Sequence, residues 1–268
     1  MARVFSHNEN WEGYMGQMRI AAGGFAILVV SLQSIAAGAA DTKLFTTNGV
    51  RAVLNQIGPQ FQRETGNVLD IQYGAGPVLK RQIEAGEAFD VAILPLDIGD
   101  LISQGKIIAD TRVVLGRTGY GAAVRMGAPR PDISTADSLK RALLNAKLVA
   151  YAAEGVSGTY FLNLLKRLGI AAEMQSKIKP ATAAAGSMAA LVSGEADIAI
   201  GGIAVILSAP SVELAGWLPS DLQSHVVFTA GVSASTSDIK ASKALVNMLT
   251  TPAAVTLFKS AGIEPASP

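Results

Sequence analysis

The sequence predicts an α/β protein, and three observations indicate this class. Strand-like and helix-like segments alternate along the chain, as they do where helices join the parallel strands of one sheet. Residues 89–94 form an apolar run interrupted by Asp90 alone, which is typical of a parallel strand covered by helices on both faces. Turns of small residues separate several strands from the helices that follow, and these turns recur in both halves of the chain.

The expected strands are short, and most of them run directly into a turn that contains glycine, asparagine or serine. Residues 68–73 follow the pattern of a strand, and the turn after them leads into a helix. Residues 113–124 are extended but broken by glycines, and we interpret them as a crossover between two parts of the fold. The other expected strands cover residues 43–46, 89–94, 148–152, 198–200 and 226–232.

Helices are expected where apolar residues recur every three or four positions and a glycine or proline ends the pattern. The first runs from Val50 to a stop at Gly66, and the second follows Pro77, a residue that suits the first turn of a helix. Residues 134–135, a serine and a threonine, are expected to cap a helix that ends at Leu144. The second helix continues over residues 79–85, and the remaining expected helices cover residues 98–104, 160–168, 187–192, 242–249 and 253–260.

The first 40 residues are expected to be a secretory signal peptide that is cleaved near Ala40. A basic residue precedes an apolar run over residues 20–32, and small residues suited to signal peptidase follow it. The run is shorter than the roughly 20 residues that span a bilayer as a helix, which argues against the alternative of a membrane anchor. A lipoprotein is excluded because the chain has no cysteine. The start codon is left open among Met1, Met15 and Met18.

Composition excludes several classes of function. The chain has 22 lysine and arginine residues against 21 aspartate and glutamate residues, and this balance, without a basic stripe, argues against a nucleic-acid partner. Because cysteine is absent and His225 is the single histidine outside the leader, neither a cysteine nucleophile nor a His/Cys metal site can form. Nucleotide-binding and hydrolase motifs are also absent from the sequence. We therefore expect no metal or organic cofactor, and we expect His225 on the surface.

Three turns, around Gly49, Gly76 and Ser157, share one property. Each lies between the C-terminal end of an expected strand and the N-terminus of an expected helix, and small residues leave it open. Helix N-termini present unpaired N–H groups and a partial positive charge, so several of them around one cleft form an anion site without lysine or arginine. Each turn alone is also what an ordinary strand–helix connection requires, and only their recurrence favours a site.

The motifs along the chain resemble those of the molybdate-binding, ModA-like branch of the type II periplasmic binding proteins. The similarity is carried by residues 44–45, 61–66 and 79–91, and residues 157–160, 191–196 and 251–254 also fall where that family has counterparts. The resemblance implies an α/β fold of two lobes, joined by two crossovers, with a ligand cleft at the hinge. The first lobe is predicted to comprise residues 41–121 plus 228–268, and the second lobe residues 122–227.

The resemblance also implies which residues line the cleft. Molybdate binders of this family use serines of the first and second turns, backbone N–H groups of the third and fourth, and a tyrosine late in the second lobe. The corresponding positions here are Gly49, Gly76, Ser157, Ala185 and Gly202, so both serines and the tyrosine are absent. The side chains expected to compensate in part are Thr46, Thr47, Asn48 and Ser157. The predicted cleft residues are Thr47, Asn48, Gly49, Ala75, Gly76, Ser157, Gly158, Ala185 and Gly202.

These observations predict an extracytoplasmic solute-binding protein of an ABC importer, and not an enzyme. It is expected to be a periplasmic monomer that delivers a small anion to an ABC transporter permease. Because glycines replace three donors and are expected to widen the cleft, a small organic carboxylate suits the cleft at least as well as molybdate or tungstate. Two alternatives stay open: a sensor-type receptor subunit, and a secreted hydrolase or isomerase on the same scaffold, for which His225 would have to face the cleft.

Overall fold

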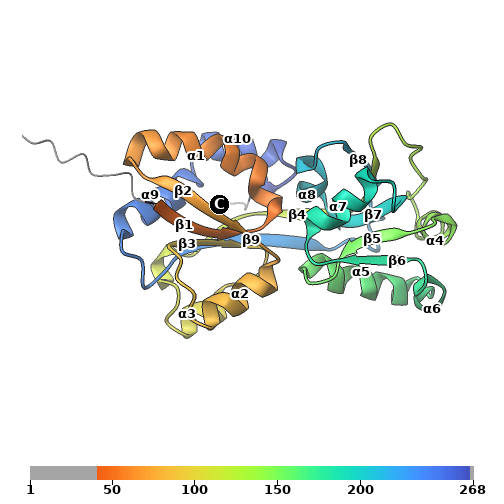
Figure 1. Cartoon of the computed structure of the whole chain (residues 1–268), viewed down its shortest axis with the longest axis horizontal. Coiled ribbons are helices and arrows are strands. Elements are labelled where there is room, and N and C mark those ends of the chain that lie inside the picture. The colour runs from red at the N-terminus through yellow and green to blue at the C-terminus, as the bar shows by residue number, and fades with distance from the viewer. Residues whose placement is uncertain (1–40, 266–268) are drawn as a thin grey trace, which may run out of the picture. The chain divides into compact units, whose positions relative to one another are not determined.

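One long strand connects the two halves of the structure, a computed structural model that describes residues 41–265. This strand, β4 (Val113–Arg125), pairs with β9 (His225–Val232) through residues 113–119 and with β7 (Ile198–Gly202) through residues 120–123. The hydrogen-bonded strand order is β2-β1-β3-β9-β4-β7-β5-β6, so the sheets of the two lobes meet within β4 (Figure 1). The expected signal peptide, residues 1–40, lies outside the described residues.

In the first lobe, helices cover both faces of a mostly parallel sheet. Strands β1 (Asp41–Thr46), β2 (Val68–Tyr73) and β3 (Val91–Leu94) are parallel, and β9 pairs antiparallel with β3. All residues of β3 are buried, as expected for a strand covered on both faces. One face carries α1 (Arg51–Thr65), α9 (Ile239–Met248) and α10 (Pro252–Ser260), and the other carries α2 (Gly76–Glu84) and α3 (Gly99–Ser103) (Figure 1).

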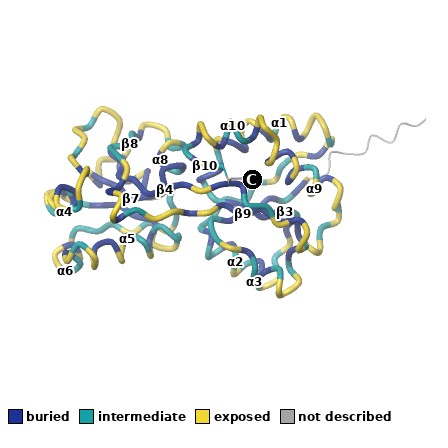
Figure 2. The backbone as a smooth tube through the Cα atoms, turned by 180° about the vertical axis from the view of Figure 1, so that it is seen from behind, coloured by how far each residue is buried: buried dark blue, intermediate teal, exposed yellow. Residues whose placement is uncertain are grey.

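The second lobe has the same layered arrangement around β5 (Val149–Ala152). Strands β6 (Ile178–Ala181) and β7 lie parallel on either side of β5, and β8 (Val212–Trp217) pairs antiparallel with β4. Figure 2 shows that buried residues follow the central strands, whereas the outer sides of the helices are exposed. The helices of this lobe are α4 (Ala136–Asn145), α5 (Val156–Arg167), α6 (Ala171–Met174), α7 (Ala184–Val192) and α8 (Ile203–Ser208).

Three short elements complete the first lobe and its border. A 3-10 turn, η1 (Asn48–Val50), leads into α1, and a second, η2 (Ala109–Thr111), precedes β4. The last strand, β10 (Glu264–Pro265), pairs antiparallel with β4. Within residues 41–265, no helix has both the length and the apolar character that a bilayer crossing requires.

The junction between the lobes lies where β4 changes its partner, between residues 119 and 120. There the ring of Tyr120 stacks on that of Tyr160, with 3.8 Å between ring centroids and 4° between ring planes. Gln223 accepts a hydrogen bond from the Tyr120 N–H at 2.7 Å and donates one to the Tyr120 carbonyl at 3.0 Å. This change of partner lies next to Gly121, where the sequence predicted that the first segment of lobe one ends. The exact limits of the two lobes stay predictions.

The expected strands and the longer expected helices are confirmed, with ends that differ by a few residues. The sequence analysis missed β6, α6, α8 and β8. β6 is a short edge strand that contains Pro180, and a proline normally counts against a strand. α8 begins directly at the end of β7, with Gly202 as its N-cap residue, so no turn in the sequence marks its start. α5 begins at Val156 rather than at residue 160, because small residues expected to form a turn form its first helical turn.

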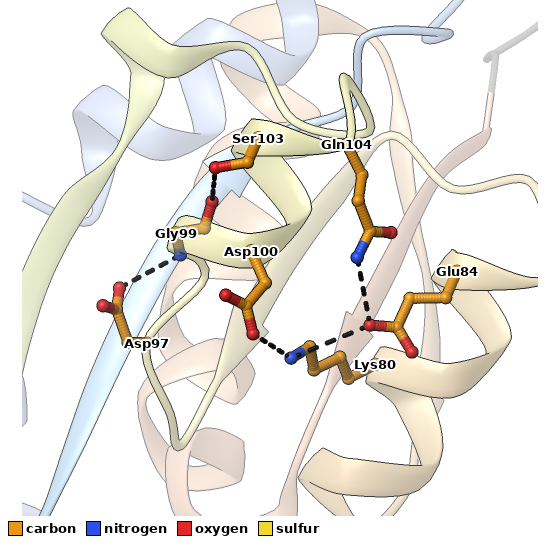
Figure 3. Close-up of polar contacts among 7 residues, drawn as sticks. All are labelled: Lys80, Glu84, Asp97, Gly99, Asp100, Ser103 and Gln104. Atoms are coloured by element: carbon orange, nitrogen blue, oxygen red, sulfur yellow. Dashed lines mark hydrogen bonds and ion pairs between the residues drawn. The ribbon is translucent and has the colours of Figure 1, made fainter.

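A polar network on the outside of the first lobe ties α2 to α3 (Figure 3). Lys80 of α2 lies 2.6 Å from Asp100 of α3 and 3.7 Å from Glu84, measured from its Nζ to the carboxylate oxygens. Gln104 donates a hydrogen bond to Glu84 at 3.4 Å. The hydrogen bond to Asp100 is the main reason that the pKa of Lys80 is raised. These contacts orient α2, whose opposite end points to the space between the lobes.

Candidate functional site

A cavity of about 60 Å³ lies where the turns after β1, β2, β5 and β7 meet, between the two lobes. An apolar cavity of about 150 Å³ is known to hold one benzene ring, so this smaller cavity suits a single anionic group of a few non-hydrogen atoms. Six of the nine predicted cleft residues line it: Thr47, Asn48, Ala75, Gly76, Ser157 and Gly202.

The helix ends around the cavity lack side-chain caps, whereas comparable helix ends elsewhere have them. Among the described helices of eight or more residues, α4, α9 and α10 are capped by Thr135, Asp238 and Thr251, whose side chains accept first-turn N–H groups. None of these three helices lines the cavity. The helices that begin at the cavity are α1 (through η1), α2, α5 and α7, and no side chain caps their first turns. In α2, α5 and α7 the third N–H donates to the N-cap carbonyl, and Pro77 has no N–H. The N–H groups without an intrahelical acceptor are therefore those of the first one or two residues, and they surround a space that a ligand can fill.

These helix ends create a positive field without a cation. The N-terminus of a helix carries the equivalent of roughly half a positive charge, concentrated in its first turn. Within the described part of the chain, the residues lining the cavity include no charged or titratable side chain. The arrangement can hold a small anion by N–H dipoles, and its lining offers no group that exchanges a proton near neutral pH.

Three predicted polar side chains line the cavity: Thr47, Asn48 and Ser157. Asn48 is oriented by Arg51, whose Nε and Nη2 donate hydrogen bonds to the Asn48 Oδ1 at 3.0 and 2.7 Å. The amide NH₂ of Asn48 is therefore the group that it can offer to a ligand. Arg51 is itself held over the ring of Tyr73, with its Cζ 3.7 Å from the ring centroid.

Two other threonines near the cavity have hydroxyls that are already engaged. Thr46 was expected to compensate for a lost serine, but it is fully buried, does not line the cavity, and donates to the Ile93 carbonyl at 3.0 Å. Thr118 of β4 lines the cavity although the sequence analysis did not single it out. Its hydroxyl donates to the Gly262 carbonyl at 2.7 Å and accepts from the Ala204 N–H at 3.3 Å. Thr118 therefore shapes the wall rather than offering a further donor.

The three glycines that the sequence analysis matched to side-chain donors of the molybdate binders, Gly49, Gly76 and Gly202, have different surroundings. A Cβ at Gly49 would lie 2.7 Å from the ring of Phe228, and a Cβ at Gly76 would lie 2.7 Å from the ring of Pro95. Both rings line the cavity, so the expectation that these two glycines widen the cleft is wrong. At Gly202 a Cβ would meet no atom closer than 3.7 Å, so this position alone has room for a side chain.

The other three predicted cleft residues do not line the cavity. Gly49 is buried beneath it. A Cβ at Gly158 would lie 2.2 Å from the carbonyl oxygen of Ala152, so this glycine lets α5 pass close to the end of β5. Ala185 lies in a neighbouring groove beside α7. The lining residues that the sequence analysis missed include Pro95, Thr118, Val205, Val226 and Phe228. No local pattern marks them, because they come from segments that only the tertiary fold brings to the turns.

His225 is exposed at the start of β9, as expected, and does not line the cavity. It borders a separate groove of about 390 Å³ that also contains Asp97, Arg112 and Tyr120. Asp97 and Arg112 form an ion pair there at 3.2 Å. The pKa of Asp97 is lowered mainly by a hydrogen bond from the Gly99 N–H, and to a smaller extent by one from Arg112. Among the described residues, no cluster of His, Cys, Asp and Glu side chains has the arrangement of a metal site.

Sequence comparison places most of the described chain within one family. The family model described as bacterial extracellular solute-binding protein matches residues 42–264. A protein named aconitate isomerase, from a Pseudomonas species, is 26% identical over 248 residues, which cover 90% of this chain and 94% of that protein.

Solved structures with the same fold include binding proteins for different anions. The periplasmic molybdate-binding protein of Azotobacter vinelandii matches with a TM-score of 0.71 at 20% identity, covering 84% of this chain and 100% of the other. A structure of PEB3, a Campylobacter jejuni protein, with bound L-phospholactate matches with a TM-score of 0.64 at 16% identity, covering 84% and 100%. These likenesses establish the two-lobed type II periplasmic binding fold that the sequence motifs predicted.

Proposed function

The chain belongs to the family of bacterial extracellular solute-binding proteins, and we propose that it binds a small organic anion between its lobes and delivers it to an ABC permease. The observation that carries this proposal is the group of four uncapped helix ends around an uncharged cavity. Such ends bind carboxylate or oxyanion groups through N–H dipoles. Two named relatives support an organic ligand: the aconitate isomerase, whose name specifies a carboxylate substrate, and PEB3, which binds L-phospholactate.

The walls of the cavity favour an organic anion over molybdate. A buried tetrahedral oxyanion needs donors on all sides, and hydrogen bonds to charged groups are each worth about 1.5–3 kcal/mol. Phe228 and Pro95 occupy the space of two serines found in molybdate binders, and they present carbon rather than hydroxyl groups. A ligand with a carboxylate and an apolar skeleton uses both the dipoles and these apolar surfaces.

The remaining parts of the proposal follow from the sequence and the family. We place the protein in the periplasm, after removal of a signal peptide over residues 1–40. We assign residues 41–121 and 228–268 to the first lobe and residues 122–227 to the second. We propose that the protein acts as a monomer without a metal or organic cofactor.

A second candidate function, isomerisation of a small unsaturated carboxylate, is favoured by the relative named aconitate isomerase. A reaction that moves a proton needs a group that accepts and returns it. The lining residues of the cavity include no such side chain within the described chain, and His225 borders a different groove. These observations support binding over catalysis.

The ligand class is tested by purifying the exported protein without denaturation and measuring melting shifts. The panel comprises molybdate, tungstate, sulfate, phosphate and small mono-, di- and tricarboxylates, including both isomers of aconitate. A ligand at a hundredfold excess over its Kd stabilises the folded state by about 2.7 kcal/mol, which a melting curve resolves. We expect a larger shift with an organic anion than with molybdate. If no anion of the panel raises the melting temperature, the proposal fails, and conversion of one aconitate isomer into the other would establish the enzymatic alternative.

Gly202→Val tests whether the cavity holds the ligand. Gly202 lines the cavity and has room for a Cβ, so the added side chain should fill the ligand space without a backbone clash. We expect at least a hundredfold loss of affinity by calorimetry with little change in melting temperature of the free protein. The matched control is Gly201→Val on the same strand, where a Cβ would lie 3.6 Å from the flexible end of Met188. Equal affinity of Gly202→Val and the unmodified protein would place the ligand elsewhere.

A further inference from the structure

A second and larger cavity adjoins the first. It is a groove of about 620 Å³ beside α7, which we call the α7 groove, and it shares Asn48 and Val205 with the central cavity. Asn48 and Arg51 form its border in the first lobe, and α7, α8 and the residues that directly follow them, Ser193 and 209–211, form the rest. Asn48 therefore lies between the two spaces, and Ser208 of α8 donates a hydrogen bond to its carbonyl at 3.4 Å. In Figure 1, α8 lies beside the start of α1, where η1 contacts it.

The walls of the α7 groove are mostly apolar because alanine, methionine and valine side chains of α7 face it. Ala185 and Ala189 are one helical turn apart on this face, and Met188 and Val192 flank them. The alanines end close to the backbone, which leaves the groove about ten times the volume of the central cavity. Among the described residues that line the α7 groove, Arg51 is the only charged one.

Arg51 is held in place and lacks a carboxylate partner. Its guanidinium stacks on Tyr73 and donates to Asn48, and these contacts use only part of its five N–H donors. Within residues 41–265, no carboxylate lies within ion-pair distance of it. A half-buried guanidinium fixed in this way loses little further conformational freedom when it binds a carboxylate.

We propose that the ligand carries two anionic groups and occupies both spaces. This inference rests on the proposed function and specifies its ligand class. One carboxylate lies in the central cavity among the helix ends, the carbon skeleton passes Asn48 into the α7 groove, and the second carboxylate pairs with Arg51. The ligand class is thus a dicarboxylate or a larger polycarboxylate with an apolar skeleton, which the central cavity of about 60 Å³ alone is too small to enclose.

The groove that contains His225 is the other direction in which a ligand can extend, and it is less suited to a second carboxylate. It shares Pro95, Val156 and Val226 with the central cavity and contains Arg112. Arg112, however, already pairs with Asp97 at 3.2 Å, so an incoming carboxylate would meet another carboxylate there. Repulsion between like charges favours extension toward Arg51.

The first test compares acids of equal length on the full exported protein by calorimetry, with butyrate against succinate and pentanoate against glutarate. We expect each diacid to bind at least tenfold more tightly than its monoacid. Arg51→Gln should remove most of this preference, and Arg51→Lys should retain part of it because it keeps the charge but not the fork geometry. The matched control is Arg63→Gln, an exposed position on the same helix, which should leave the preference unchanged.

The second test fills the α7 groove without touching the charged group. Ala189→Leu should weaken glutarate at least tenfold and leave acetate and molybdate unaffected, whereas Ala253→Leu on the exposed side of α10 should weaken none of them. If diacids bind no more tightly than monoacids, or if Ala189→Leu leaves glutarate unaffected, the two-space ligand is wrong while anion binding stands. If no anion binds at all, both this inference and the proposed function fail.

Discussion

The longer helices that begin at the cavity have no side-chain cap, whereas the longer helices that begin elsewhere have one. The capped ends contribute to the stability of the free protein, and the uncapped ends are available to a ligand. α4, α9 and α10 satisfy first-turn N–H groups with the side chains of Thr135, Asp238 and Thr251. Such a cap typically stabilises a protein by about 1 kcal/mol. It is absent from the first turns of α1, α2, α5 and α7. Among the described helices of eight or more residues, those without a side-chain cap are the ones that begin at the cavity, so ligand binding should stabilise the protein at these ends.

The largest expected effect is at the start of α5. Gly158→Ala adds a Cβ at 2.2 Å from the Ala152 carbonyl oxygen and 2.8 Å from that of Ala153, so α5 must move away from β5. We expect a loss of about 3 kcal/mol in the free energy of unfolding, measured by urea denaturation, since backbone atoms cannot yield as a flexible side chain does. Gly201→Ala, where the nearest atom is a flexible methyl group, is the control. A variant as stable as the parent protein would show that the close approach of α5 to β5 is not required.

A cap introduced at the cavity should have opposite effects on stability and on binding. Ala183 is the N-cap residue of α7 and has an extended backbone conformation, which suits aspartate in that role. We expect Ala183→Asp to raise the free energy of unfolding by about 1 kcal/mol and to lower anion affinity about tenfold, because the carboxylate takes the N–H groups and repels the ligand. Urea denaturation and calorimetry measure the two effects. Higher stability with unchanged affinity would mean that the end of α7 does not take part in binding.

The reverse substitution, removal of a cap far from the cavity, should affect stability alone. Asp238→Ala is expected to cost about 1 kcal/mol at pH 7 and to leave ligand affinity unchanged. Hydrogen bonds from the Ala241 N–H and then the Asn67 amide lower the pKa of Asp238 in the folded protein. Its contribution is thus fully present above the unfolded pKa of about 3.9 and is lost as the pH falls through the lower folded pKa.

The stability difference between the parent protein and Asp238→Ala should therefore shrink in acid, and urea denaturation at a series of pH values measures it. Asp238→Asn keeps a hydrogen-bond acceptor that does not titrate. The difference in free energy of unfolding between Asp238→Asn and Asp238→Ala should therefore persist in acid. A difference between the parent protein and Asp238→Ala that is constant down to pH 2 would contradict the assigned role of the carboxylate.

The smallest expected effect is that of pH on binding. The described residues that line the cavity do not titrate near neutral pH, and arginine stays protonated. Burial raises the pKa of nearby Tyr160 to about 12, so this tyrosine remains neutral as well. The affinity for a carboxylate that is fully ionised above pH 5.5 should change less than about threefold between pH 5.5 and 8.5, by calorimetry. A larger change would show that a titratable group outside the cavity lining takes part in binding.

Many of the residues that line the cavity could be predicted because they follow strands. Thr47, Asn48, Ala75, Gly76 and Ser157 each lie in a turn where a strand pattern gives way to a helix pattern, and such turns meet at the carboxyl edge of an α/β sheet. Gly158 and Gly49 belong to the same turns, but sequence spacing cannot tell a residue that faces the ligand from one that packs behind the turn.

By itself, the sequence determined the alternation of strands and helices, the open turns, the lack of cysteine and the family, because these depend on local pattern and composition. Only the tertiary structure decided that the rings of Phe228 and Pro95 fill the space where side chains at positions 49 and 76 would lie, and that the α7 groove opens beside Asn48 with Arg51 at its border. These features come from contacts between segments far apart in the chain. The contacts of Phe228 and Pro95 form within the first lobe, when β9 and the end of β3 pack beside the turns after β1 and β2. The α7 groove forms where the second lobe meets Asn48 and Arg51, and no local sequence pattern encodes either arrangement.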